Sequence, residues 1–169
     1  MNDLKDALEA LEAVGGVLKT KTIILASQSP RRVEILKGLG LEFKAVPSTF
    51  EENLEKAGKT PAEYVVATCQ GKAEEVYKRL VSQGENVGLL ISADTVVVRD
   101  QTVLEKPASA QDAIDTLTSL SNRTHSVYTG VTLMWPSEEK NAPPKMHQFF
   151  EETGVEFLPL SAETIKAYV

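Results

Sequence analysis

Apolar residues recur along the chain at two spacings, and each spacing predicts an element. A period of about 3.6 residues is typical of helices, whereas alternation, or a short apolar run between turn residues, is typical of strands. We therefore expect helices at residues 2–14, 30–39, 61–80, 110–120 and 162–169, and strands at 23–26, 41–46, 87–98, 103–104, 124–134 and 148–158. Helices and strands alternate early and strands dominate later. This order predicts a mixed α/β (α+β) fold, with helices flanking a twisted mixed sheet.

Residues 87–98 form the clearest of these strands, because both alternating sets of side chains are largely apolar. Such a strand is expected at the centre of a sheet, covered on both sides. Ser92, Asp94 and Thr95 interrupt the apolar run. A carboxylate in a buried strand is costly unless it is paired, hydrogen-bonded or bound to a metal. Asp94 is therefore the best catalytic candidate, and its alternative is a structural aspartate bonded to backbone at a bulge.

Polar residues also gather where the first strand ends. Ser27 and Ser29 close the apolar run, Ser29 is a natural N-cap, and Pro30 stands at the first helical position. Arg31 and Arg32 follow in the first turn, where they oppose the helix dipole unless an anion lies between them and the free backbone N–H groups. Phosphate suits them, because a planar guanidinium group binds two oxygens at once. The alternative is that both arginines are solvated surface residues.

Other charged side chains are candidates for the same site, each with an ordinary alternative. Lys72 lies at the edge of the apolar face of the long helix, where a lysine either extends to water or points into a cleft towards phosphate. Lys106 follows a predicted hairpin that returns it towards the buried aspartate, and its alternative is a salt bridge with a surface acid. Glu51 and Glu52 lie in a loop, where they are either solvated or ligands of a hard divalent cation.

Composition narrows the class of protein. The chain has 169 residues, 42% of them hydrophobic, which predicts one domain with a substantial core. The net charge of -6 argues against a nucleic-acid binder. There is no apolar run of membrane length and no signal-peptide pattern, so we expect no membrane contact and a cytoplasmic location. The single cysteine, Cys69, excludes an internal disulfide.

The candidate residues favour phosphate chemistry over covalent catalysis. The sequence lacks a nucleophile elbow and a dinucleotide-binding fingerprint, and Gly71-Lys72 lacks the rest of a P-loop. One buried acid, one loop acid and several cations suit metal-assisted attack of water on a phosphoryl centre, in which Asp94 orients or deprotonates the water. These residues alone also allow a phosphoesterase, a kinase-like enzyme or a simple nucleotide-binding protein.

Four blocks, in order, carry a resemblance to a known family: residues 25–32 (LASQSPRR), 92–97 (SADTVV), 104–107 (LEKP) and 120–131 (LSNRTHSVYTGV). They resemble the motifs of the Maf family of nucleoside triphosphate pyrophosphatases. The resemblance implies a fold like that of Maf and inosine triphosphate pyrophosphatases. It also implies release of a nucleoside monophosphate and pyrophosphate with Mg²⁺ or Mn²⁺. The 124–127 segment resembles the branch acting on dTTP, UTP and modified pyrimidine nucleotides, and the implied role is removal of non-standard nucleotides.

The resemblance further implies roles for particular residues. It makes Asp94, Lys106 and Lys72 catalytic, Ser27, Arg31, Arg32 and Thr95 substrate-binding, and Glu52 and Asp94 ligands of the metal. A homodimer is common in the family, which gives a second copy of the chain as an expected partner beside the nucleoside triphosphate substrate.

The resemblance covers residues 21–169, which we expect to form one Maf-like domain after an N-terminal helical extension at 1–20. Family members continue past the end of this sequence into a block with an active-site glutamine, so we expect a domain truncated at its C-terminus. The competing hypothesis is therefore a catalytically impaired nucleotide-binding or regulatory protein that acts through a partner.

Overall fold

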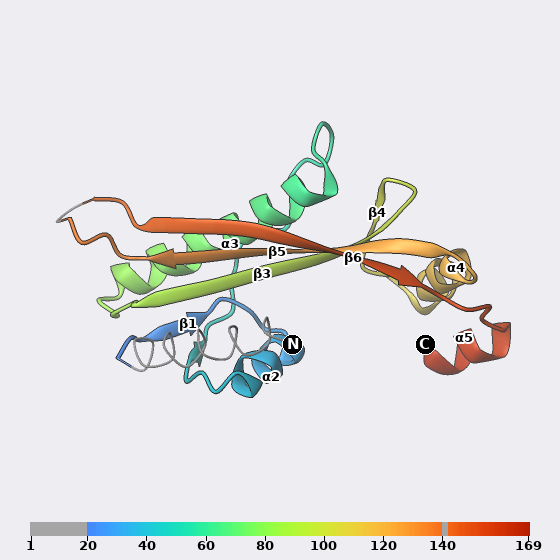
Figure 1. The fold of residues 1–169 in the computed structure, drawn as a ribbon, viewed down its shortest axis with the longest axis horizontal. Coiled ribbons are helices and arrows are strands. Elements are labelled where there is room, and N and C mark those ends of the chain that lie inside the picture. The colour runs from blue at the N-terminus through green and yellow to red at the C-terminus, as the bar shows by residue number, and fades with distance from the viewer. Residues whose placement is uncertain (1–19, 140–141) are drawn as a thin grey trace, which may run out of the picture.

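Six strands in the described part of the chain form one mixed sheet. The computed structural model describes residues 20–139 and 142–169. The strands are β1 (Ile23–Leu25), β2 (Lys44–Ala45), β3 (Leu89–Arg99), β4 (Thr102–Leu104), β5 (Thr124–Trp135) and β6 (Lys145–Glu156). Their order is β2-β1-β3-β5-β6, with β4 paired to β3. β1 is parallel to β2 and β3, whereas the other pairs are antiparallel (Figure 1).

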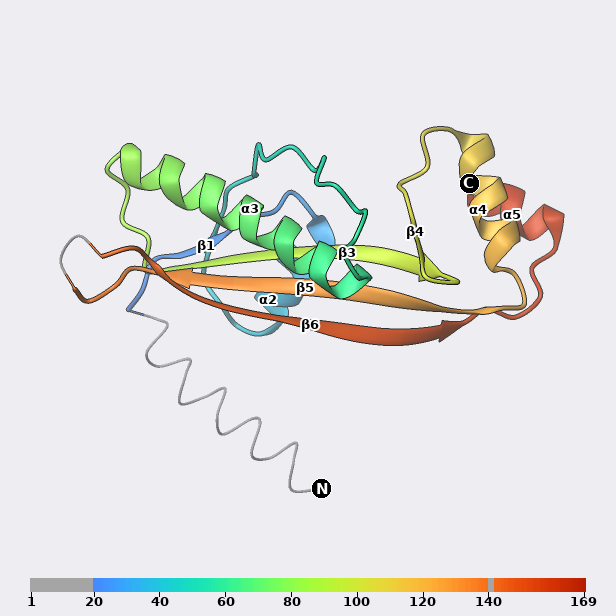
Figure 2. The same ribbon diagram turned by 90° about the horizontal axis from the view of Figure 1, so that it is seen from above.

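The helices that accompany this sheet are α2 (Pro30–Gly38), α3 (Pro61–Ser82), α4 (Ala110–Leu120) and α5 (Ala162–Tyr168). α3 lies along β3 and β5, with α2 on the opposite side of the long strands (Figure 1). α4 and α5 lie side by side at one end of the sheet (Figure 2). The predicted mixed α/β fold is confirmed. The extension predicted at 1–20, with its helix at 2–14, lies outside the described residues except for Thr20.

α3 forms where the sequence predicts it, because both its start and its buried face are encoded locally. The Thr60 hydroxyl accepts a hydrogen bond from the Glu63 backbone N–H, and the Glu63 carboxylate accepts one from the Thr60 backbone N–H, which completes a capping box before Pro61. The apolar face then buries residues at helical spacing: Val65, Cys69, Ala73, Val76 and Leu80. The charged residues of the site are therefore attached to a rigid element.

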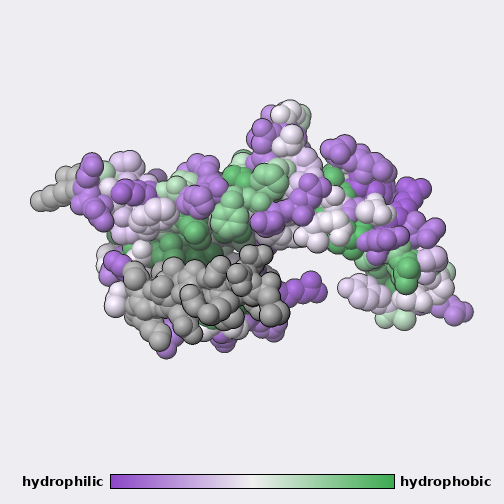
Figure 3. All heavy atoms as spheres, viewed as in Figure 1, coloured by the Kyte–Doolittle hydropathy of each residue, from purple (hydrophilic) through white to green (hydrophobic). Residues whose placement is uncertain are grey.

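The core lies between α3 and the strands β1, β3 and β5. Its members are Ile24, Ala26, Val46, Ala73, Val76, Leu80, Val87, Leu90 and Met134. Figure 3 shows hydrophobic residues along the middle of one face, over the long strands, and hydrophilic residues around α4 and the N-terminal end of α3. Within the described ranges, the helices are too short or too polar to cross a membrane.

Three local predictions differ from the structure. The strand expected at 41–46 is reduced to Lys44–Ala45, because only those residues pair with β1. The last strand begins at Lys145 rather than Gln148, because the ladder with β5 continues to the pair Trp135–Lys145. β3 is central, but only one set of its alternating side chains is deeply buried. That set faces α3, whereas most of the other set is half-buried.

Candidate active site

The central strand β3 has a gap along one edge. β5 pairs with residues 90–98 of β3, so it occupies one edge of the strand almost throughout. β1 pairs with residues 89–91 and β4 with residues 97–99, and both must therefore lie along the other edge. Residues 92–96 have a neighbouring strand on one edge only. Asp94 lies in the middle of this gap, in register with Gly130 of β5.

A line of alternating charges begins at the gap. The Lys72 ammonium lies 2.8 Å from Asp94 Oδ1 and 2.9 Å from Glu52 Oε1. Lys106 Nζ lies 3.5 Å from Glu52 Oε2 and has an 86% exposed side chain. Asp94 and Lys72 are buried, whereas Glu52 is 40% exposed. The line therefore runs from the interior to solvent, with the acid Asp94 at its buried end and the cation Lys106 at its exposed end.

The ionisation of this line follows from its hydrogen bonds. Burial acts to lower the pKa of Lys72, but its hydrogen bonds to Asp94 and Glu52 outweigh burial and raise that pKa above its usual value. Burial acts to raise the pKa of Glu52, but the hydrogen bond and charge of Lys72, followed by the charge of Lys106, hold it below its usual value. Lys72 and Glu52 are therefore both charged near neutral pH.

A second group of polar side chains lies beside the gap on the other face of β3, because Thr95 directly follows Asp94 in the strand. Arg32, in the first turn of α2, donates from Nη1 to Ser27 Oγ at 3.2 Å and from Nη2 to Thr95 Oγ1 at 3.4 Å. Thr95 Oγ1 lies 3.1 Å from Thr129 Oγ1. Ser29 is the N-cap of α2 as predicted, but its side chain makes no capping bond, and its N–H donates to Ser27 Oγ. Ser27 therefore fixes both the loop and the guanidinium group.

The Cys69 thiol lies close enough to the site for its charges to act on it. Its thiol donates to the Gly130 carbonyl at 3.0 Å. Burial, and after it the negative charge of Asp94, raises the pKa of Cys69 to about 12, while the positive charges of Lys72 and Arg32 act to lower it. The thiol is therefore an inert group buried on the apolar face of α3. The acid and both cations lie close enough to one point to act on it together.

The structure decides several of the ordinary alternatives. Lys72 is buried and paired, so it does not extend to water. Asp94 belongs to a regular ladder and accepts a bond from lysine, so the bulge interpretation is wrong. Lys106 pairs with the loop acid Glu52 rather than with Asp94. Arg31 is exposed and its side chain makes no hydrogen bond or ion pair with another described residue, so the structure does not bring it into these contacts.

Two contributors to the site were not predicted from the sequence. Thr129 reaches Thr95 from β5, and the register of these strands gives this contact, which single-strand patterns do not. Glu75 holds the loop before Glu52 by accepting bonds from Ser48 and Thr49. Its spacing of four residues from Arg79 is a signal for a helical ion pair, but nothing in the sequence indicates the loop contacts.

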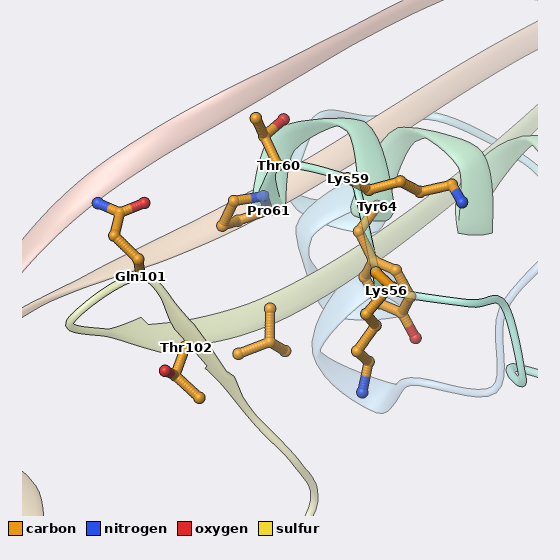
Figure 4. Close-up of a pocket in the computed structure, with 9 residues that line it drawn as sticks. Lys56, Lys59, Thr60, Pro61, Tyr64, Gln101 and Thr102 are labelled. Atoms are coloured by element: carbon orange, nitrogen blue, oxygen red, sulfur yellow. The ribbon is translucent and has the colours of Figure 1, made fainter.

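A cavity of about 330 Å³ lies between the N-terminal end of α3 and the hairpin of β3 and β4 (Figure 4). Tyr64, Lys56 and Lys59 contribute to its wall. Lys56 pairs with Glu105 and lies 5.2 Å from the centre of the Tyr64 ring, and Lys59 Nζ donates to the Glu55 carbonyl at 2.9 Å. Both lysines are thus already partnered within the protein, and none of the predicted site residues lines this cavity.

The fold and the site together define a mixed α/β protein with a charged site where the edge of its central strand is open. The family model of Maf-like proteins matches residues 22–169. The chain belongs to this family, which confirms the resemblance carried by the four sequence blocks.

Individual relatives agree with this assignment. The chain is 43% identical over 157 residues to the probable bifunctional dTTP/UTP pyrophosphatase/methyltransferase protein of Homo sapiens, covering 91% of this chain and 25% of that protein. It is 47% identical over 112 residues to the dTTP/UTP pyrophosphatase of Clostridium perfringens strain 13, covering 66% and 56%. The chain thus spans about a quarter and about half of the lengths of these two curated relatives.

Among solved structures, the chain resembles a nucleoside-triphosphatase, a dITP/XTP pyrophosphatase, from Mycobacterium abscessus. The TM-score is 0.45 at 13% identity, with 80% of this chain and 73% of that chain covered. A likeness of this size does not refine the mixed α/β class that the strands and helices themselves establish.

Proposed function

We propose that the protein is a nucleoside triphosphate pyrophosphatase. It hydrolyses dTTP, UTP and modified pyrimidine nucleotides and acts in the cytoplasm. Water attacks the polyphosphate, the bond between the α and β phosphates breaks, and a nucleoside monophosphate and pyrophosphate are released. Support comes from relatives named dTTP/UTP pyrophosphatases. The observation that carries the proposal is the buried Asp94–Lys72 pair at the open edge of β3, with Arg32 bonded to the neighbouring Thr95.

Each cation in this proposal offsets part of the polyphosphate charge. Arg32 and the exposed Arg31 lie in the first turn of α2, where a helix N-terminus adds positive potential of its own. Lys106 is the most exposed of the paired cations, so it is free to turn from Glu52 towards an arriving phosphate. Arginine suits phosphate because it presents parallel N–H donors, and lysine acts as a mobile point charge.

Asp94 is proposed to orient the attacking water and to accept its proton. Lys72 binds Oδ1, and no other described side chain donates to this carboxylate, so Oδ2 remains an acceptor. The Lys72 ammonium group binds both carboxylates and so holds Asp94 and Glu52 close together. Its positive charge offsets one of the two negative charges that these acids bring to the site.

We also propose that Glu52 and Asp94 hold a divalent cation, Mg²⁺ or Mn²⁺. The donor set fits, because carboxylate oxygens are the ligands that hard cations prefer. The residues with described positions contain no group of three His, Cys, Asp or Glu suited to a metal ion. Two carboxylates agree with a cation that keeps several waters and takes further oxygens from phosphate. When bound, it would supply charge stabilisation at the phosphates.

The test is pyrophosphate release from a panel of dTTP, UTP, dCTP, dATP and dGTP with Mg²⁺ or Mn²⁺. We expect turnover of the uracil and thymine nucleotides, with pyrophosphate rather than orthophosphate as product. Asp94→Asn should lower kcat by about 100- to 1,000-fold, because it removes a group acting directly on the reaction. Asp115→Asn on the exposed face of α4 is the matched control and should leave kcat unchanged. Nucleotide binding without turnover under either metal would instead support the regulatory alternative.

A further inference from the structure

The loop that carries Glu52 has no helix or strand of its own, yet it must place a carboxylate on Lys72. Residues 46–60 connect β2 to α3 without regular secondary structure. Glu52 is 40% exposed, so burial of its own side chain does not hold it in place. An irregular loop gains fixed geometry only from specific contacts with a rigid element, and α3 provides them.

Glu75 makes the main contacts between α3 and this loop. Its Oε2 accepts from Ser48 Oγ at 2.8 Å and from the Thr49 backbone N–H at 2.9 Å, while Oε1 accepts from Arg79 Nε at 2.6 Å. Arg79 Nη2 in turn donates to the Pro47 carbonyl at 2.7 Å. Glu75 and Arg79, one helical turn apart, thus bind three consecutive residues of the loop, 47–49.

A packing contact extends the attachment towards the site. The Phe50 backbone N–H donates to Ser48 Oγ at 3.0 Å, so the Ser48 hydroxyl links Phe50 to Glu75. The Phe50 ring fills the space in which a Cβ at Gly71 would lie. Gly71 directly precedes Lys72 in α3. The loop is therefore fixed to α3 from residue 47 to residue 50, two residues before Glu52 reaches Lys72.

The charge of Glu75 suits this role. Burial acts to raise its pKa, but hydrogen bonds from Arg79, Thr49 and Ser48 lower the pKa of Glu75 to about 2. The carboxylate therefore stays ionised near neutral pH. Charge-assisted hydrogen bonds are stronger than neutral ones, so this one side chain is well suited to hold a loop.

We propose that Glu75 is a positioning residue, which fixes residues 47–50 on α3 so that Glu52 is held on Lys72 and beside Asp94. The proposal rests on the proposed function, in which Glu52 helps to hold the metal. Glu75 touches neither substrate nor reacting atoms, and its effect on the reaction passes through Glu52.

The experiment is a double-mutant cycle on the full chain, measured as kcat/KM for dTTP and as the Mg²⁺ concentration giving half-maximal rate. Glu75→Gln should lower kcat/KM by about 10- to 100-fold and raise the Mg²⁺ requirement, because Glu52 would lose its fixed position as a metal ligand, and loss of support around a metal ligand has an effect of this size. Glu74→Gln makes the same change at the preceding, exposed position, and its kcat/KM should stay within about twofold of wild type. In a Glu52→Gln background, Glu75→Gln should add less than about twofold.

Ser48 supplies a second variant, in case Glu75→Gln does not fold. Ser48→Ala should lower kcat/KM, and Ser48→Thr, which keeps the hydroxyl, should restore it. Equal effects of Glu75→Gln in both backgrounds would show that Glu75 does not act through Glu52, and would overturn the proposal.

Amide hydrogen exchange separates this proposal from the proposed function. The Thr49 and Phe50 amides should be protected in wild type and in Glu74→Gln, and should exchange faster in folded Glu75→Gln. Rapid exchange of both amides in active wild-type protein would overturn the positioning role alone. Absence of pyrophosphate release from wild type would overturn the proposed function, and with it the kinetic role of Glu75.

Discussion

Replacing Lys72 with methionine changes the charge balance of the site with little change in volume. Lys72 Nζ lies 2.8 Å from Asp94 Oδ1, and both side chains are under 10% exposed, so solvent screens this pair weakly. At an effective dielectric constant of about 20, the pair attracts by about 6 kcal/mol, part of which offsets the cost of desolvating two ions. The variant leaves two neighbouring carboxylates without their shared cation. We expect the free energy of unfolding to fall by about 3 kcal/mol.

Urea and thermal unfolding near neutral pH, with EDTA present, measure this loss. For a chain of this size, about 3 kcal/mol corresponds to a melting temperature about 6–12 °C lower. Mg²⁺ or Mn²⁺ should recover more stability in Lys72→Met than in wild type, because a bound cation would replace the missing positive charge. Lys78→Met, on the exposed face of the same helix, should change the free energy by less than about 0.5 kcal/mol. A loss below about 1 kcal/mol in Lys72→Met would refute the reasoning.

Three further predictions follow from contacts around the site. Because burial and then Asp94 raise the pKa of Cys69 to about 12, a thiol reagent at about pH 8 should react with it only after unfolding in urea. Gly130→Ala should cost about 1–3 kcal/mol, because the new Cβ would lie 2.8 Å from the Val65 backbone, whereas Gly154→Ala meets no atom within 4 Å and serves as control. The pKa of Glu75 is lowered to about 2, so its contribution to the free energy of unfolding is complete above about pH 4.5 and is lost as the pH falls to about 2. In acid unfolding, the free energy of unfolding of Glu75→Gln should therefore depend less steeply on pH across this range than that of wild type.

Local patterns predict the elements that carry their own signals. α3 has a capping box at Thr60 and Glu63 and a long apolar face, so its start and its buried side both follow from the sequence. β3 has a long apolar run, which predicts its central place. β2 has only two paired residues, and its pairing depends on where β1 lies, so no local pattern gives its limits.

The site shows the same division between local and long-range information. Asp94 can be found in the sequence because an acid inside an apolar strand is costly to bury unless it is paired or bound. Its partner Lys72 lies on a helix, and periodicity places that lysine at the edge of the buried face without giving the direction of its side chain. Glu75 could not be found, because its partners Ser48 and Thr49 belong to an irregular loop whose path is set only in the folded chain.

The open edge of β3 explains how an acidic chain can bring several cations to the candidate site. With a net charge of -6, the chain as a whole would repel a polyphosphate, so the proposed substrate needs positive charge gathered locally. Arg32 comes from the start of α2, Lys72 from α3 and Lys106 from the segment after β4. Arg32 bonds to Thr95 and Lys72 to Asp94, in the stretch of β3 that pairs with neither β1 nor β4, and Lys106 joins them through Glu52. Since the convergence depends on this pairing, a substitution that shifts the register of β3 should disperse the cations even if every charged residue is kept.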